Sequence, residues 1–153
     1  MRYWLFKSEP SCFSFQDLQA RPNATEHWDG VRNFQARNFL RDQIAVGDQV
    51  LFYHSSIPEP AIVGLCSVVR PGYPDHTALD PAADHFDPKA SPDKPIWYMV
   101  DVRADQPLPQ PVLLATIRQH PLLQEMPLVN RSRLSIQPLT ADQFRILLKL
   151  GGL

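Results

Sequence analysis

The run Ala61–Arg70, AIVGLCSVVR, constrains the fold more than any other part of this chain. It is almost continuously apolar and ends in a single arginine. A segment that is apolar at successive positions, rather than at alternate ones, is typical of a strand buried on both faces. The run therefore predicts a central strand of a sheet that other elements cover on both sides.

Other segments have the aromatic and β-branched content of strands and are bounded by turn residues. These further predicted strands are Arg2–Ser8, Gln49–His54, Ile96–Arg103 and SRLSIQPL at residues 132–139. A long segment rich in Pro, Asp and His, residues 70–95, separates the central strand from the next one. A loop of this length inside a compact domain is usually functional or mobile.

Short helices are predicted between these strands. Ser14 with Asp17, and Thr140 with Gln143, form two capping-box patterns, which indicate helices over 15–20 and from 141 to the glycines at 151–152. The segment LLATIRQHPLL predicts another helix that ends near Pro121. Strands scattered among short helices predict an α+β fold, a small, curved, mixed sheet or open barrel with peripheral helices.

Size and charge limit the function classes. The 153 residues suit one domain over 1–153. The net charge is −1 and the isoelectric point is about 6.5, whereas a bulk electrostatic DNA binder typically exceeds ~9. Any nucleic-acid role must therefore be local. The chain has no apolar run of membrane-spanning length and no signal-peptide pattern, so we expect no membrane association and a cytoplasmic location.

Common catalytic and cofactor motifs are absent. There is no nucleophile elbow, P-loop, dinucleotide fingerprint or zinc-protease motif, so we predict no cofactor and assign no catalytic residue. Cys12 and Cys66 form no CxxC pair, which argues against a zinc site or disulfide scaffold. The loop holds Asp and His residues between Asp75 and Asp87, and we interpret it as a solvated acidic loop rather than a metal site.

The segment WDGVRNFQARNFL, residues 28–40, gathers an aromatic, arginines and amides. Trp28 either fills the core or offers a wall on which a planar ligand stacks. Asn33 can cap the helix that follows. Helical spacing places Phe34 and Arg37 on the polar face of that helix, opposite Ala36.

Three further groups lie at predicted strand ends. Lys7 and Ser8 end the first strand, and Tyr53 and Ser55 lie where the second strand turns. Each group has an ordinary structural explanation in solvation, turn formation or core packing. Together with Trp28 and Asn33 they also supply the aromatic, amide and hydroxyl groups that would bind one unpaired base. Arg32, Arg131 and Arg133 are candidates for holding a phosphate.

Six motifs, in order, resemble the EVE domain family of the PUA-like superfamily, which is related to YTH and ASCH domains. They are YWLFKSEP, WDGVRNFQARNFL, VGDQVLFYHSS, IVGLCSVV, WYMVDV and RLSIQPL, and the resemblance extends from Tyr3 to Leu150. It implies a small curved β-barrel with surrounding helices. It also implies a non-enzymatic reader of a modified base in DNA or RNA, such as modified cytosine, or of a free modified nucleoside.

The similarity to YTH domains implies individual roles. Lys7 and Ser8 would touch the base edge, Trp28 would be a cage wall, and Arg133 would hold a phosphate. The second cage wall stays open among Tyr73, Phe86 and Trp97. On this interpretation, Trp28→Ala should abolish binding.

Two other functions are weighed against this one. Some ASCH-type relatives hydrolyse an acylated cytidine, and Lys7 and Glu9 could serve as the corresponding amine and acid. A protein-interaction module is the third interpretation and ranks last, because no long apolar face remains beyond those the core needs. The oligomeric state stays open.

Overall fold

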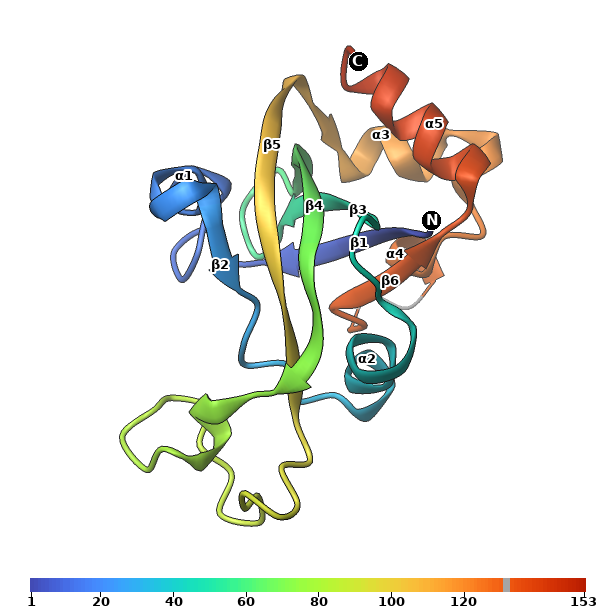
Figure 1. The fold of residues 1–153 in the computed structure, drawn as a ribbon. Helices are drawn as coiled ribbons and strands as arrows, with labels where there is room; N and C mark the ends of the chain where they lie inside the picture. Colours follow the sequence, from blue (N-terminus) through green and yellow to red (C-terminus); the bar gives the residue numbers. More distant parts are fainter. Residues whose placement is uncertain (131–132) are drawn as a thin grey trace.

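The computed structural model describes residues 1–130 and 133–153. Six strands form one mixed sheet in the order β2-β5-β4-β3-β1-β6, with β1 parallel to β3 and the other neighbours antiparallel. The strands are β1 (Tyr3–Ser8), β2 (Thr25–His27), β3 (Gln49–His54), β4 (Ala61–Pro74), β5 (Tyr98–Leu113) and β6 (Ile136–Leu139). The predicted central strand lies within β4, whose two neighbours in the sheet are β3 and β5 (Figure 1).

Helical segments surround the sheet and are all short. In Figure 1, α1 lies beside β2 and α2 lies below β6, whereas α3, α4 and α5 come after β5 in the chain. They are α1 (Phe15–Ala20), η1 (Pro22–Ala24), α2 (Phe34–Asn38), η2 (Phe39–Gln43), η3 (His76–Leu79), α3 (Leu114–Gln119), η4 (Pro121–Leu123), α4 (Pro127–Asn130) and α5 (Ala141–Leu150). Both predicted capping boxes are present, at α1 and α5. The described part of the chain contains no helix long and apolar enough to span a membrane.

The α+β class is confirmed, but the barrel is not. The edge strands β2 and β6 lie at opposite ends of the strand order and do not pair with each other, so the sheet stays open. In the described residues β2, of three residues, pairs with β5, and β6, of four residues, pairs with β1, so each edge strand keeps one side without a strand partner.

Two strands are longer than predicted. β4 continues to Pro74, and β5 runs from Tyr98 to Leu113 although it contains prolines at 107, 109 and 111. A proline cannot donate to a ladder and is tolerated where one edge is unpaired. Beyond Arg103, β5 has no partner on the β2 side, which accounts for the prolines.

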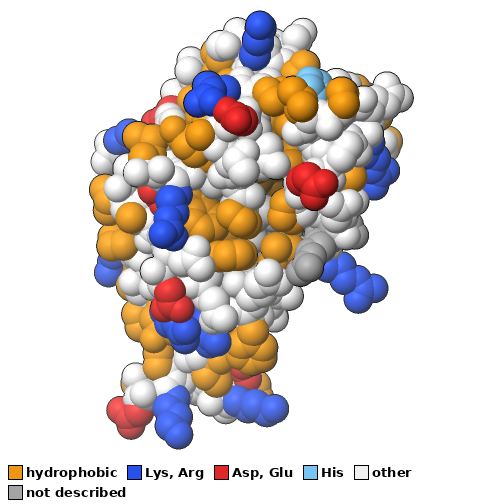
Figure 2. Space-filling model, turned by 90° about the vertical axis from the view of Figure 1, so that its right-hand side faces the viewer, with side chains coloured by type: hydrophobic (Ala, Val, Ile, Leu, Met, Phe, Trp, Pro, Cys, Tyr) orange, Lys and Arg blue, Asp and Glu red, His pale blue; other side chains and the backbone are white. Residues whose placement is uncertain are grey.

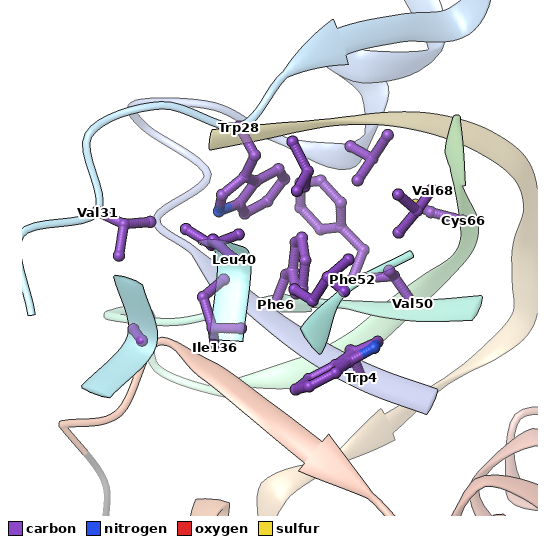
Figure 3. Close-up of a cluster of buried hydrophobic side chains, with 14 of the residues drawn as sticks. Trp4, Phe6, Trp28, Val31, Leu40, Val50, Phe52, Cys66, Val68 and Ile136 are labelled. Carbon is purple, nitrogen blue, oxygen red and sulfur yellow. The ribbon is translucent and has the colours of Figure 1, made fainter. Parts of the chain in front are cut away.

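Two hydrophobic clusters cover the two faces of the sheet. Trp4, Phe6 and Phe52 point into one of them, together with Trp28 (Figure 3). Leu5 and Tyr53, at alternate positions of the same strands, point into the other, against α5. This alternation follows from the two-residue period of a strand, and it decides which residues at the strand ends can reach a common site.

Candidate nucleic-acid interface

A pocket of about 650 Å³ opens at the carboxyl end of β1. Its volume falls within the range of ~300–1,000 Å³ that is typical of small-ligand sites. The described residues that line it come from the end of β1 and the turn after it, from the segment that enters and leaves β2, from the long loop and from the residue just before β6. They are residues 7–9, 12–13, 21, 26–32, 84–85 and 135.

Trp28 forms the floor of this pocket rather than a free-standing wall. Its side chain is only 8% exposed, and its ring centroid lies 5.2 Å from those of Phe6 and Phe52 (Figure 3). Its backbone N–H donates to the Val100 carbonyl at 2.7 Å, which fixes the segment against β5. The indole therefore belongs to the core and also lines the pocket.

Phe13 supplies a second aromatic surface that sequence reasoning missed. Its ring lies edge-on to Trp28 at 6.2 Å and 82°, and it is half-buried in the pocket lining. The Ser8 hydroxyl donates to the Phe13 carbonyl at 2.5 Å, so the end of β1 positions this ring. The Arg21 guanidinium lies 5.4 Å from the Phe13 ring centroid, at a distance typical of a cation–π contact.

Lys7 and Ser8 both line the pocket, but their side chains lie on opposite faces of the sheet. The Lys7 ammonium lies 6.0 Å from the centroid of the Tyr53 ring, on the face of the second cluster. Partial burial lowers the pKa of Lys7. Ser8 therefore lies with Phe13 and Trp28, and Lys7 lies with Tyr53.

Arg32 lines the pocket while its donors bind the protein itself. Its guanidinium donates to Asp75 at 3.0 Å and to the His85 carbonyl at 2.7 Å. Gly30 has φ +78° and lies so close to His85 that an added Cβ would stand 2.6 Å from the imidazole. These contacts join the segment after Trp28 to the long loop, and so the loop closes one side of the pocket.

The other predicted site residues that the structure describes, which are Asn33, Tyr53, Ser55 and Arg133, lie outside the pocket lining. Asn33 caps α2 as predicted, accepting from the Ala36 N–H at 3.0 Å. Tyr53 is 2% exposed, and the Ser55 N–H donates to the Ser8 carbonyl at 2.9 Å. Arg133 is exposed, and Arg131 lies outside the described residues.

None of the three candidates for a second cage wall lines the pocket. Tyr73 donates its hydroxyl to Asp101, and burial, reinforced by this hydrogen bond, raises its pKa. Trp97 is 5% exposed and stacks on Phe34, and Phe86 is 38% exposed. The long loop instead contributes residues 84–85.

Charges around the pocket are mixed. Arg21 and Arg32 face Glu26, Asp29 and Asp84 in the same lining. Figure 2 shows another side of the molecule, where hydrophobic side chains gather at the centre and Lys and Arg stand apart around them. A mixed lining suits a neutral ring with hydrogen-bonding edges better than a densely anionic ligand. In the described part of the chain, no group of three or more His, Cys, Asp or Glu side chains could hold a metal.

Comparison with known proteins decides the family. The EVE domain profile matches residues 2–150.

The chain belongs to the EVE domain family.

Several relatives of this EVE domain share most of its length. Thymocyte nuclear protein 1 of Danio rerio is 43% identical over 96% of this chain and 71% of its own. The human protein of that name is 42% identical over 97% of this chain and 73% of its own. The crystal structure of human THYN1 with DNA that contains 5-methylcytosine has a TM-score of 0.95 at 40% identity and covers 100% and 99% of the two chains.

Two further structures are similar to this chain to very different degrees. A Pseudomonas putida protein has a TM-score of 0.92 at 46% identity and covers 97% of this chain and 99% of its own. The YTH domain of a Zygosaccharomyces rouxii protein has a TM-score of 0.57 at 17% identity and covers 98% and 86%. At that identity the YTH likeness shows a shared fold. The expected family is confirmed, and the YTH domain shares the fold.

The expected cytoplasmic location is wrong. The relatives from Danio rerio and human are named as nuclear proteins. The prediction rested on size and composition, which are alike in proteins of the cytoplasm and the nucleus, and this is why it failed.

Protonation of the buried Asp75 should lower the stability of this EVE domain at acid pH. Burial alone would raise the pKa of Asp75, but hydrogen bonds from Thr77, Gly30 and Arg32 outweigh burial and lower it. A carboxyl with a lowered folded-state pKa stabilises the protein above its unfolded pKa of ~3.9, and this contribution is lost as the pH falls through the folded value. We expect Asp75→Asn to be less stable than wild type at pH 7, and the difference to shrink below about pH 4.

Urea unfolding of both proteins at pH 7, 5 and 3 measures this difference. Asp93→Asn, at an exposed position of the same loop, is the matched control and should change little. A gap between wild type and Asp75→Asn that stays constant from pH 7 to pH 3 would contradict the assignment.

Proposed function

We propose that this EVE domain binds nucleic acid through one modified base, held in the pocket that Phe13 and Trp28 line. The observation that carries the proposal is the pocket itself, which combines two aromatic rings, the Ser8 strand end and the cation Arg21 in one lining. Its mixed charge fits a neutral base whose phosphates remain at the rim. The complex of human THYN1 with DNA that contains 5-methylcytosine supports a modified cytosine as the base.

Selectivity would come from burial of the modifying group. A methyl group gains ~0.8 kcal/mol on burial, which corresponds to a preference of roughly fourfold. Stacking on an aromatic ring adds ~1–3 kcal/mol per base to the binding free energy of the methylated and the unmethylated strand alike. Placement of Lys7, Asn33, Tyr53, Ser55 and the arginines on the bound strand remains a prediction. The geometry favours Ser8, Phe13 and Trp28 as the direct contacts.

Binding of oligonucleotides with one 5-methylcytosine or one cytosine, single- and double-stranded, at fixed salt tests the proposal. Wild type should prefer the methylated strand by about fourfold or more. Phe13→Leu should weaken binding of the methylated strand about 5- to 100-fold, because it removes a stacking ring and keeps an apolar side chain. Phe86→Leu makes the same change at an exposed position outside the pocket lining and should bind like wild type.

Equal affinity for the two strands, with no effect of Phe13→Leu, would rule out this pocket as a base reader.

Hydrolysis of a modified nucleoside is a second candidate, because Lys7 and Glu9 line the same pocket. Lys7 has a lowered pKa, and Glu9 accepts from the Ser56 hydroxyl at 3.1 Å. Incubation of the protein with acylated and methylated cytidines, followed by mass spectrometry, distinguishes the two functions. Turnover that Glu9→Gln abolishes would establish the enzyme, and unchanged nucleosides would favour the reader.

A further inference from the structure

Phe34 is an exposed aromatic that the modified-base pocket does not use. It is 60% exposed and lies outside the pocket lining. It is the first residue of α2, whose start is fixed by the Asn33 cap. One side of its ring stacks on Trp97 at 4.8 Å and 27°, so its large exposure means that the rest of the ring faces solvent.

The support beneath Phe34 is rigid and strained. The Trp97 indole N–H donates to the Asp87 carboxylate at 2.7 Å, which fixes the orientation of that ring. Ile96 has φ +62°, a left-handed conformation that is uncommon for a β-branched residue. The Arg37 guanidinium donates to the Ile96 carbonyl at 2.6 Å. Backbone strain of this kind persists where the surroundings impose it and often occurs at functional sites.

A cation lies beside the exposed ring. The Arg37 guanidinium carbon is 5.0 Å from the Phe34 ring centroid, and this side chain is half-buried rather than fully solvated. An aromatic ring with an adjacent arginine is the combination by which proteins stack a nucleobase and attract its phosphate.

Arg32 connects this ring to the pocket. It lines the pocket, and its guanidinium carbon lies 5.4 Å from the Trp97 ring centroid. Two contacts, 5.4 Å and 4.8 Å, therefore lead from the pocket wall to Phe34. The Phe34 ring therefore lies within about 10 Å of the Arg32 guanidinium carbon, which is no more than about three base steps of ~3.4 Å.

We propose that Phe34, supported by Trp97 and flanked by Arg37, is a second stacking site that holds an unmodified base near the modified one on the same strand. The inference rests on the proposed function, because it needs a strand whose modified base occupies the pocket. It adds a contact that reads the presence of a neighbouring nucleotide, and it makes the preferred ligand a strand rather than a free nucleoside.

A double-mutant cycle, with one change in the protein and one in the oligonucleotide, tests the inference. The ligands are single-stranded oligonucleotides with a central 5-methylcytosine and an abasic site at each of the three positions on either side in turn. Phe34→Ala should bind the intact strand about 5- to 100-fold more weakly than wild type, the range expected for one lost stack. At the abasic position that removes the base stacked on Phe34, the wild type should bind more weakly than it binds the intact strand, by the same factor. Phe34→Ala should lose little further affinity at that position, because the substitution and the abasic site remove the same stacking interaction.

Two variants control for general effects. Phe34→Tyr keeps a ring and should bind like wild type. Leu122→Ala removes a side chain that is 68% exposed, in η4, and should leave binding unchanged. Because Phe34 is exposed, Phe34→Ala should unfold at nearly the urea concentration of wild type.

The outcomes separate this inference from the function on which it rests. If Phe13→Leu weakens binding and Phe34→Ala does not, the modified-base pocket stands and the second stacking site is wrong. Additive losses at every abasic position would overturn the inference as well. If wild type shows no preference for the methylated strand, both proposals fail.

Discussion

Trp28→Ala is expected to lower the free energy of unfolding by about 3–5 kcal/mol, the usual range for a large aromatic removed from a core. The indole is 8% exposed and packs between Phe6 and Phe52, so its removal leaves a cavity that the two strands beneath cannot close. The loss should appear as a lower urea midpoint with an unchanged slope. Binding of the methylated strand should also be lost, because the pocket would have no floor.

Loss of binding in Trp28→Ala alone would not identify a ligand contact, because the substitution also damages the core. Trp28→Phe separates the two effects, since it keeps an aromatic floor and most of the buried volume. We expect it to recover most of the stability and to bind measurably, though more weakly than wild type. An alanine variant as stable as wild type would show that the indole is not packed as the structure places it.

Arg32→Ala is expected to destabilise the protein by about 3–5 kcal/mol, because it leaves a buried carboxylate without its cation. Asp75 is fully buried, and Arg32 is the cation that pairs with it at 3.0 Å. The same substitution removes the donors to the His85 carbonyl, so the long loop should detach from the segment after Trp28. Proteolysis within residues 75–90 should therefore accelerate together with the loss of stability.

Arg41→Ala is the matched control for this loss. Arg41 pairs with Asp42, its neighbour on the surface, and solvent screens an exposed pair of this kind, so its loss should change the stability little. Arg32→Lys keeps the charge but not the planar fork, so it should fall between wild type and Arg32→Ala. An Arg32→Ala protein that is no less stable than Arg41→Ala would mean that the Arg32 donors are free to hold a phosphate instead.

The burial of Arg32 changes how its predicted role is understood. Sequence reasoning assigned it to a phosphate, and that assignment remains a prediction. Its side chain is 20% exposed and its donors contact Asp75, Thr77 and the His85 carbonyl. A phosphate would have to compete with these contacts, whereas Arg21 offers a more exposed guanidinium at the same pocket.

Local sequence signals determined much of the secondary structure. Both capping boxes, the Asn33 cap and the buried β4 strand follow from interactions within a few residues or from the periodicity of apolar side chains. The family was also evident, because motifs such as WDGVRNFQARNFL are long enough to be specific. The central strand was recognisable because a strand buried on both faces leaves no room for alternating polar residues.

The composition of the pocket depended on tertiary structure. The pairing of β1 with β3 places Lys7 beside Tyr53 and Ser8 on the face of Trp28, and sequence gives the alternation but not which face meets the pocket. Phe13 reaches the site only because the turn after β1 folds back to the Ser8 hydroxyl. The long loop returns because Asp75 and His85 bind Arg32 some 43 and 53 positions away. Short-range patterns determined which elements form, whereas contacts between residues far apart in the chain determined which of their side chains share one cavity.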